Sequence, residues 1–256
     1  MARMRIAAAN WKMYKNRAQA KAFIEAFAKA GPWTGAAKAV ICPPFTSLDV
    51  VAAGVGSSGV AVGAQDLYWE AEGAFTGEVA PGMIKDAGCT YVIVGHSERR
   101  KLFGETDATV NKKLQAAVKA GLIPIMCVGE TLEEREAGKT ENVVRTQVTA
   151  GLAGFDAGVL KGFVVAYEPV WAIGTGKVAT PQQAQEVHAV IRKLLAATGA
   201  EVAAAVPILY GGSVKPDNIA ALMAGPDLDG GLVGGASLDP VSFGAIVKGI
   251  AEAKRP

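Results

Sequence analysis

Cysteine, charge of one sign and long apolar runs are all scarce in this sequence, and each scarcity excludes a class of protein. Cys42, Cys89 and Cys127 are its three cysteines in 256 residues, and none has CxxC spacing. A disulfide framework is therefore not indicated. An odd number of thiols in apolar segments is typical of a reducing compartment, so we expect a cytoplasmic protein.

The charges nearly cancel: 26 Lys and Arg residues balance 24 Asp and Glu residues, for a net charge of +2. The basic residues form no block that could follow a nucleic-acid backbone. No apolar run approaches the ~20 residues of a membrane span. Asn10 and Lys12 interrupt the apolar start of the chain, so no signal peptide is indicated. No ligand spacing predicts a metal, and we expect no metal, no cofactor, no nucleic acid and no membrane partner.

Hydrophobic residues are abundant at 50%, with only 7% aromatic residues, and this composition suits a sheet that is buried on both faces. One unit recurs, in which a short β-branched apolar run is followed by a helical pattern. We expect strands over residues 5–9, 39–42, 60–64, 91–94, 123–128, 163–167, 208–210 and 231–233. We expect helices that include residues 17–30, 105–120, 141–151, 181–198 and 241–253.

Eight such units in ~250 residues is the count at which a parallel α/β sheet closes on itself. Each interval between strands leaves room for a crossover helix. No linker or change in composition marks a domain boundary. We therefore predict a (β/α)8 barrel with eight parallel strands, forming one domain over residues 1–256. An open doubly wound sheet is the alternative.

Chemically unusual residues follow several of the predicted strands. Asn10 and Lys12 follow the first strand, His96 follows the fourth and Glu168 follows the sixth. In a barrel these positions share one rim, where catalytic groups lie. Each residue alone has an ordinary explanation, such as a helix cap for the carboxylate or a surface position for the histidine. Their common placement predicts one site.

Glycine pairs follow the seventh and eighth predicted strands, as Gly-Gly-Ser at 211–213 and Gly-Gly-Ala-Ser at 234–237. Bare backbone N–H groups beside a helix start bind anions, and these two loops commonly hold phosphate in barrels. The alternative is that the glycines only permit tight turns. We predict a phosphate site there.

The segment after Glu168 is typical of a lid. Pro169 prevents a helix from starting at once, whereas Thr180, with proline and glutamine after it, predicts a capped helix from Pro181. Between these fixed points lies an apolar stretch with a Gly-Thr-Gly tail. Such a loop gains by closing over a filled pocket. The alternative is a loop that is permanently packed on the barrel.

These groups suit proton abstraction beside a carbonyl in a small phosphate ester. Glu168 would be the base, and burial under a lid would raise its pKa. His96 would donate to the carbonyl as a neutral imidazole, favoured by an adjacent helix start. Lys12 would offset developing negative charge, and Asn10 would hold a substrate oxygen or Lys12 itself. The other histidine, His188, lies in a helical pattern and is expected only to pack.

The sequence also resembles the triosephosphate isomerase family over nearly its whole length. The motifs AANWKM, VGHSER, CVGE, AYEPVWAIGTGKVAT, YGGSV and VGGASL stand in the family's order and spacing. The resemblance implies interconversion of glyceraldehyde 3-phosphate and dihydroxyacetone phosphate, in glycolysis and gluconeogenesis. Tyr14 and Lys15 depart from the Asn-Gly often found at this point, which affects the shape of the loop.

The resemblance also implies roles for individual residues. Glu168 would be the base, His96 the electrophile and Lys12 the cationic partner, with Asn10 in the site. The substrate phosphate would be held by backbone at Gly174, Ser213, Gly234 and Gly235.

A long loop, residues 65–78, carries Tyr68, Trp69 and Phe75. Long aromatic loops in compact domains usually bind something. The family uses this loop, here from Gln65 to Glu78, as its homodimer interface, with Thr76 near the partner's site. We predict a homodimer; a loop that packs only on itself is the alternative.

Two rival functions keep the barrel and the phosphate. One is another small phosphosugar isomerase, and the short lid and compact site favour a small substrate. The other is a phosphate-ligand-binding protein without catalysis. Such a binder would need the glycines but neither Glu168 nor His96.

Overall fold

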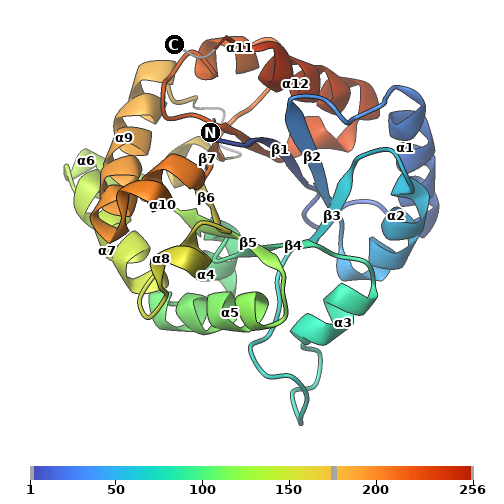
Figure 1. The fold of residues 1–256 in the computed structure, drawn as a ribbon, viewed down its shortest axis with the longest axis horizontal. Coiled ribbons are helices and arrows are strands. Elements are labelled where there is room, and N and C mark those ends of the chain that lie inside the picture. The colour runs from blue at the N-terminus through green and yellow to red at the C-terminus, as the bar shows by residue number, and fades with distance from the viewer. Residues whose placement is uncertain (1–2, 174–177, 255–256) are drawn as a thin grey trace.

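The computed structural model describes residues 3–173 and 178–254. Within these residues, β1 to β8 pair in chain order, all parallel, and β1 closes the sheet against β8. The (β/α)8 barrel predicted from the sequence is confirmed, and the open sheet is excluded. Figure 1 shows the barrel surrounded by its helices.

The strands lie close to the predicted positions, and three of them (β4, β5 and β7) agree with the prediction at both ends. Their bounds are β1 Arg5–Asn10, β2 Ala37–Cys42, β3 Ala61–Ala64, β4 Tyr91–Val94, β5 Ile123–Val128, β6 Val164–Tyr167, β7 Ile208–Tyr210 and β8 Gly230–Val233.

The longer helices are those that the periodicity predicted, whereas most of the shorter ones were not foreseen. Their bounds are α1 Arg17–Lys29, α2 Leu48–Val55, α3 Pro81–Asp86, α4 Ser97–Phe103, α5 Asp107–Lys119, α6 Leu132–Glu136, α7 Thr140–Gly151, α8 Ala157–Leu160, α9 Pro181–Thr198, α10 Ala200–Ala205, α11 Ile219–Leu222 and α12 Pro240–Glu252. Three short 3-10 turns are η1 Phe45–Ser47, η2 Val170–Ala172 and η3 Gly235–Leu238. None of the described helices is long and apolar enough to span a membrane.

The core has two layers because successive side chains of a strand point to opposite faces. Along β1, Ile6 and Ala8 pack inside the barrel with Leu209 and Leu232. Ala7 and Ala9 belong instead to the layer between barrel and helices, together with residues of α1 and α12. The strands are therefore fixed on both faces, and the rim at their carboxyl ends is a rigid base for a site.

The predicted start of α9 is confirmed. Thr180 Oγ1 accepts a hydrogen bond from Gln183 N at 3.1 Å, and Gln183 Oε1 accepts from Thr180 N at 3.0 Å. This capping box satisfies backbone donors that a helix start leaves free. The loop after Glu168 is thus anchored at its far end.

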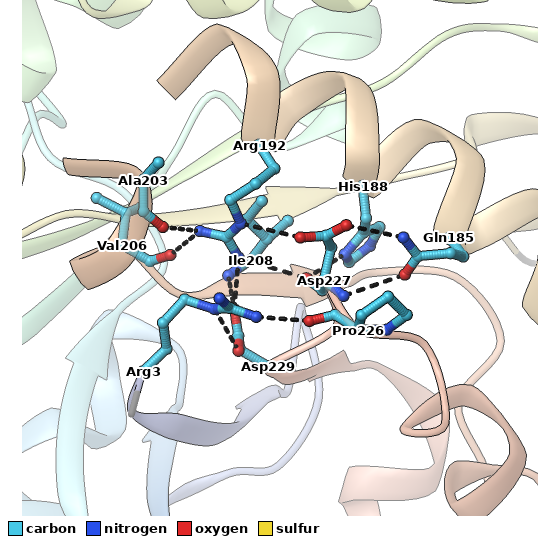
Figure 2. Close-up of polar contacts among 10 residues, drawn as sticks. All are labelled: Arg3, Gln185, His188, Arg192, Ala203, Val206, Ile208, Pro226, Asp227 and Asp229. Atoms are coloured by element: carbon cyan, nitrogen blue, oxygen red, sulfur yellow. Dashed lines mark hydrogen bonds and ion pairs between the residues drawn. The ribbon is translucent and has the colours of Figure 1, made fainter. Parts of the chain in front are cut away.

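An ionic cluster, which we call the clasp, lies near the amino-terminal ends of β1, β7 and β8 and consists of the partly buried Arg3, Arg192 and Asp227 and the buried Asp229 (Figure 2). Arg3 Nε lies 2.9 Å from both carboxylate oxygens of Asp229. Arg192 contacts Asp229 at 2.7 Å and Asp227 at 3.2 Å. The clasp ties the start of the chain to the last strand and to α9.

Candidate active site

A cavity of about 280 Å³ opens at the carboxyl ends of the strands. It collects the residues that the sequence placed after separate strands. Its lining includes Asn10, Lys12, His96, Glu168, Gly211, Gly212, Ser213, Gly234 and Gly235. Gly174, predicted to bind phosphate, lies outside the described residues.

Glu168 directly follows β6, and its side chain is almost fully buried, with 1% of the residue exposed. Oε1 lies 2.8 Å from His96 Nε2 and 3.3 Å from Ser97 Oγ. Oε2 accepts a hydrogen bond from Ser97 N at 2.9 Å. The carboxylate is therefore held by three donors on the β4–α4 junction while its residue also lines the cavity.

His96 caps α4 and is oriented from both sides of its ring. Nδ1 accepts a hydrogen bond from Glu98 N at 3.2 Å, so this nitrogen carries no proton. Nε2 then carries the ring proton and donates it to Glu168. The neutral tautomer fits both contacts. The pKa of His96 nevertheless lies above its ordinary value, opposite to the direction expected from the helix start.

The pKa of Glu168 differs from the sequence-based expectation. Burial has the largest single effect and alone would raise the pKa, but His96, the Ser97 amide and the charge of Lys12 together outweigh it, so the pKa lies below its ordinary value. For His96, burial lowers the pKa and the Glu168 carboxylate more than restores it. Both shifts depend on the present Glu168–His96 contact, because the carboxylate favours protonation of the ring, and a protonated ring would favour the ionised carboxylate.

Lys12 has a left-handed backbone conformation, with φ of 51°, and is held by polar contacts. Its N–H donates to Asn10 Oδ1 at 3.0 Å, and its carbonyl accepts from Gln65 Nε2 at 2.9 Å. Its ammonium lies 2.5 Å from Glu98 Oε1. Asn10 thus holds the Lys12 backbone, which is one of the two roles we expected for it.

Both glycine pairs line the cavity, with one difference from the prediction. Gly235 begins η3, so this pair does lie beside a helical turn. Gly211 and Gly212 do not, because the next helix, α11, begins only at Ile219. The backbone of Gly212 and Ser213 still borders the cavity. The Gly-Gly-Ser loop therefore offers N–H groups without a helix dipole behind them.

Close packing between the ends of β5 and β6 fixes the position of the Glu168 backbone. A side-chain carbon added at Gly129 would lie 1.7 Å from the Glu168 carbonyl oxygen. Such a contact is impossible without moving β5 or β6. Gly129 therefore lets the two strand ends approach each other and defines where the carboxylate begins.

Three polar residues of the site region were not foreseen. Gln65 and Glu98 hold Lys12, as described above. Glu130 is fully buried, and its Oε1 accepts from Tyr167 Oη at 3.1 Å and from Trp171 Nε1 at 2.9 Å. It therefore fixes the first turn of the loop after Glu168. The motif CVGE was the available sequence signal for Glu130; nothing local marked Gln65.

The fold and the site together define a class: (β/α)8 barrels whose rim cavity is lined by a buried carboxylate, an imidazole and two glycine pairs. Comparison with known proteins narrows this class. The family described as triosephosphate isomerase matches residues 5–250. The chain belongs to the triosephosphate isomerase family.

Curated relatives agree with this family and cover nearly all of the chain. The triosephosphate isomerase of Moorella thermoacetica is 59% identical over 244 residues, which are 94% of this chain and 97% of the relative. That of Trichlorobacter lovleyi is 56% identical over 242 residues, 94% and 96% of the two chains. That of Symbiobacterium thermophilum is 54% identical over 250 residues, 97% and 98% of the two chains.

Proposed function

We propose that this chain interconverts D-glyceraldehyde 3-phosphate and dihydroxyacetone phosphate by proton transfer through an enediolate, in glycolysis and gluconeogenesis. One observation carries the chemistry: the Glu168 carboxylate and His96 Nε2 lie 2.8 Å apart on a cavity that is also lined by Gly234 and Gly235. A base, a donor and an anion site thus face one small volume.

Glu168 is the base in this proposal. In the structure its oxygens are occupied by His96 and Ser97, so it must release these donors before it can take a proton from carbon. Release removes the contacts with His96 and Ser97, which lower its pKa, whereas burial, which has the largest effect and raises the pKa, remains. The carboxylate therefore becomes more basic when it turns to the substrate.

His96 supplies the electrophile. The Nε2–H group that now contacts Glu168 would donate a hydrogen bond to the substrate carbonyl. Because Nδ1 is held by Glu98 N, the ring keeps its orientation when the carboxylate leaves. A neutral imidazole can both donate to and accept from the two substrate oxygens in turn.

Lys12 and the glycine loops bind the phosphate and offset the enediolate charge. The Lys12 side chain packs beside Gly234, where an added carbon would lie 3.6 Å from Lys12 Cε. Backbone at Gly174, Ser213, Gly234 and Gly235 would hold the phosphate, with Asn10 supporting Lys12. A placed base contributes ~10²–10⁴-fold in rate, so positioning and electrostatics must supply the rest.

A coupled assay on both triose phosphates tests this function, with Glu168→Gln as the key variant. We expect turnover to fall about 10³-fold because the amide cannot accept the proton. Affinity for inorganic phosphate should stay nearly unchanged, which separates an isomerase from a phosphate-binding protein. Turnover that survives the substitution would show that another group is the base.

Isotope exchange tests the chemical route. During turnover in deuterium oxide, the proton that Glu168 removes from carbon exchanges with solvent before a proton is returned to the enediolate. We expect deuterium in the product and in recovered substrate. A product without deuterium would indicate hydride transfer instead.

We further propose that the chain is a homodimer through the loop over residues 65–78. The loop projects away from the ring of helices (Figure 1). Tyr68 stacks on Trp69 with ring centroids 4.1 Å apart and contacts Phe75 at 4.6 Å, yet Phe75 remains 40% exposed. A preformed aromatic cluster on a projecting loop suits insertion into a partner, with Thr76 reaching that partner's site. Analytical ultracentrifugation measures the oligomeric state, and a fully active monomer would refute the proposed homodimer.

We also propose a single domain over the whole chain and a location in the cytoplasm. The three cysteines are buried and free, which suits a reducing compartment.

A further inference from the structure

Gln147 is a partly buried polar side chain on the face of α7 that packs against the barrel. It lies between Val144 and Gly151, which are both buried, in the three- and four-residue spacing of that face. A side-chain carbon added at Gly151 would lie 2.6 Å from Met126 Sδ, so α7 and β5 are in close contact here. An amide in such an apolar stripe needs polar partners, because burying it without hydrogen bonds is costly.

Both polar atoms of the Gln147 amide contact the backbone of one residue, Gly129. Oε1 accepts a hydrogen bond from Gly129 N at 2.7 Å, and Nε2 donates to Gly129 O at 3.2 Å. Within a parallel sheet, an adjacent strand supplies a donor and an acceptor to a residue in the same way. The glutamine side chain therefore takes the place of a strand beside Gly129.

The strand that is missing at this point is β4. The register pairs Val94, the last residue of β4, with Met126 of β5. Three residues further along, the position opposite Gly129 is Ser97, which already begins α4. Because the chain has left the sheet there, β4 offers no backbone partner to Gly129, and the α7 side chain provides one instead.

The segment centred on Gly129 also holds the base and the start of the loop that follows it. Val128 O accepts a hydrogen bond from Glu168 N at 2.7 Å, and Glu130 O accepts from Val170 N at 3.1 Å. The Glu168 carbonyl lies against Gly129 itself, as the packing described above shows. The glutamine amide thus fixes the centre of a three-residue segment whose other side carries the backbone of the base.

We propose that Gln147 is a positioning residue that fixes the Glu168 carboxylate through Gly129. Gln147 lies outside the active-site cavity and instead lines a second cavity of about 680 Å³, which Gly129 and Glu168 also border. Without the glutamine amide, this space would let the end of β5 shift and carry the base with it. The proposal rests on the proposed function, since it takes Glu168 as the base.

The test uses substitutions that keep the length of the side chain and change its hydrogen bonds. Gln147→Met removes both contacts with Gly129. Gln147→Glu keeps the acceptor for Gly129 N and loses the donor for Gly129 O. Arg145→Met is the matched control, because it places the same new residue on the exposed face of α7, where Arg145 pairs with Glu141.

For Gln147→Met we expect kcat to fall about 10-fold, since a small displacement of a placed base costs rate. KM for both triose phosphates, and the dissociation constant for inorganic phosphate measured by calorimetry, should stay within about twofold, because the glycine loops are untouched. Gln147→Glu should recover part of the loss and fall only about 3-fold, because one of its two hydrogen bonds remains. Arg145→Met should keep its kcat.

Hydrogen exchange of single backbone amides measures the position of the base without any turnover. In Gln147→Met we expect the amides of Glu168 and Val170 to exchange about 10-fold faster, because the segment that accepts their hydrogen bonds is loosened. The Val165 amide, which donates to Pro207 O at 3.0 Å, should be unchanged. Faster exchange at all three amides would instead indicate a general loss of stability.

An unchanged kcat for Gln147→Met would overturn the proposal even if the melting temperature fell, since that is the result of a purely structural role. A loss of kcat with an equal loss of phosphate affinity, or without faster exchange confined to Glu168 and Val170, would overturn it too. If Gln147→Met does not fold, Gln147→Glu with unchanged kcat decides against it equally. Unchanged protein that does not isomerise trioses refutes the proposed function, while the exchange comparison still decides whether Gln147 holds Glu168.

Discussion

Two buried carboxylates, Asp229 in the clasp and Glu168 at the rim, show how one barrel uses the same group for stability and for chemistry. Each residue is 1% exposed. Asp229 is contacted by two guanidinium groups and by the Ile208 amide at 3.1 Å (Figure 2). Glu168 is contacted instead by the His96 imidazole and by the amide and the hydroxyl of Ser97.

The two carboxylates differ in how completely hydrogen-bond donors surround them. Asp229 is surrounded by donors from distant parts of the chain, with Arg3 226 residues away in sequence. Glu168 is contacted by His96 and Ser97 at the β4–α4 junction and also borders the cavity. Full charge compensation immobilises a carboxylate, whereas partial compensation beside a cavity leaves a base that can change partners.

The largest expected effect comes from breaking the clasp. Asp229→Asn leaves the partly buried guanidinium groups of Arg3 and Arg192 without their shared counter-charge, although Arg192 keeps its contact with Asp227, and we expect the free energy of unfolding to fall by about 4 kcal/mol. Turnover per folded molecule should be unchanged. Urea unfolding at fixed protein concentration, with the coupled assay, measures both. Asp49→Asn is the control, because its ion pair with Arg17 is exposed and should matter little. If Asp229→Asn kept full stability but lost turnover, Asp229 would serve the reaction rather than the stability of the fold.

The next effect concerns the histidine beside the clasp. Burial lowers the pKa of His188 to about 4 from 6.5. As the pH falls, the unfolded chain binds the proton first, so the stabilisation is complete above pH 6.5 and is lost towards pH 4. This loss is about 3 kcal/mol. We expect His188→Gln, which can still donate to the Asp227 carbonyl, to remove that part of the pH dependence in unfolding measurements. If the free energy of unfolding depended equally on pH in the variant and in the unchanged protein, this prediction would be wrong.

The same substitution at the rim should act on the reaction instead. For His96→Gln we expect kcat to fall about 10²-fold, equal to about 2.7 kcal/mol in the barrier. Unfolding should change little, because the amide can donate to Glu168. His188→Gln is the matched control and should keep its kcat. Comparable losses of kcat in both variants would mean that the two histidines do not differ in role.

The smallest expected effect tests whether the Ser97 hydroxyl or the Ser97 amide orients Glu168. Ser97→Ala removes the hydroxyl at 3.3 Å but keeps the backbone donor at 2.9 Å. Because the hydroxyl contact is long, we expect kcat to change by less than about 3-fold. Steady-state kinetics measure this change. A loss above tenfold would show that the hydroxyl, rather than the amide, orients the carboxylate.

Local patterns predicted much of this molecule. The strands β4, β5 and β7 and the start of α9 follow from apolar periodicity and capping residues, which act within a few positions. The rim residues could be predicted because strand ends in a barrel share one face. This logic brought Asn10, Lys12, His96 and Glu168 to one cavity.

The remainder depends on contacts between distant residues. Nothing near Arg3 indicates Asp229, and nothing near Gln65 indicates the Lys12 carbonyl. The direction of the Glu168 pKa shift also depends on its donors, since burial and hydrogen bonding act in opposite senses. Sequence shows that such a group is buried but not which neighbour reaches it.

Gly129 has a consequence for mutational tolerance. The space where any side chain would begin is already occupied by the Glu168 carbonyl. In a saturation library we expect this codon to accept nothing else, with a penalty like that of losing the base itself. A residue with no functional group can thus be as irreplaceable as one that handles protons, and selection data alone would not distinguish them.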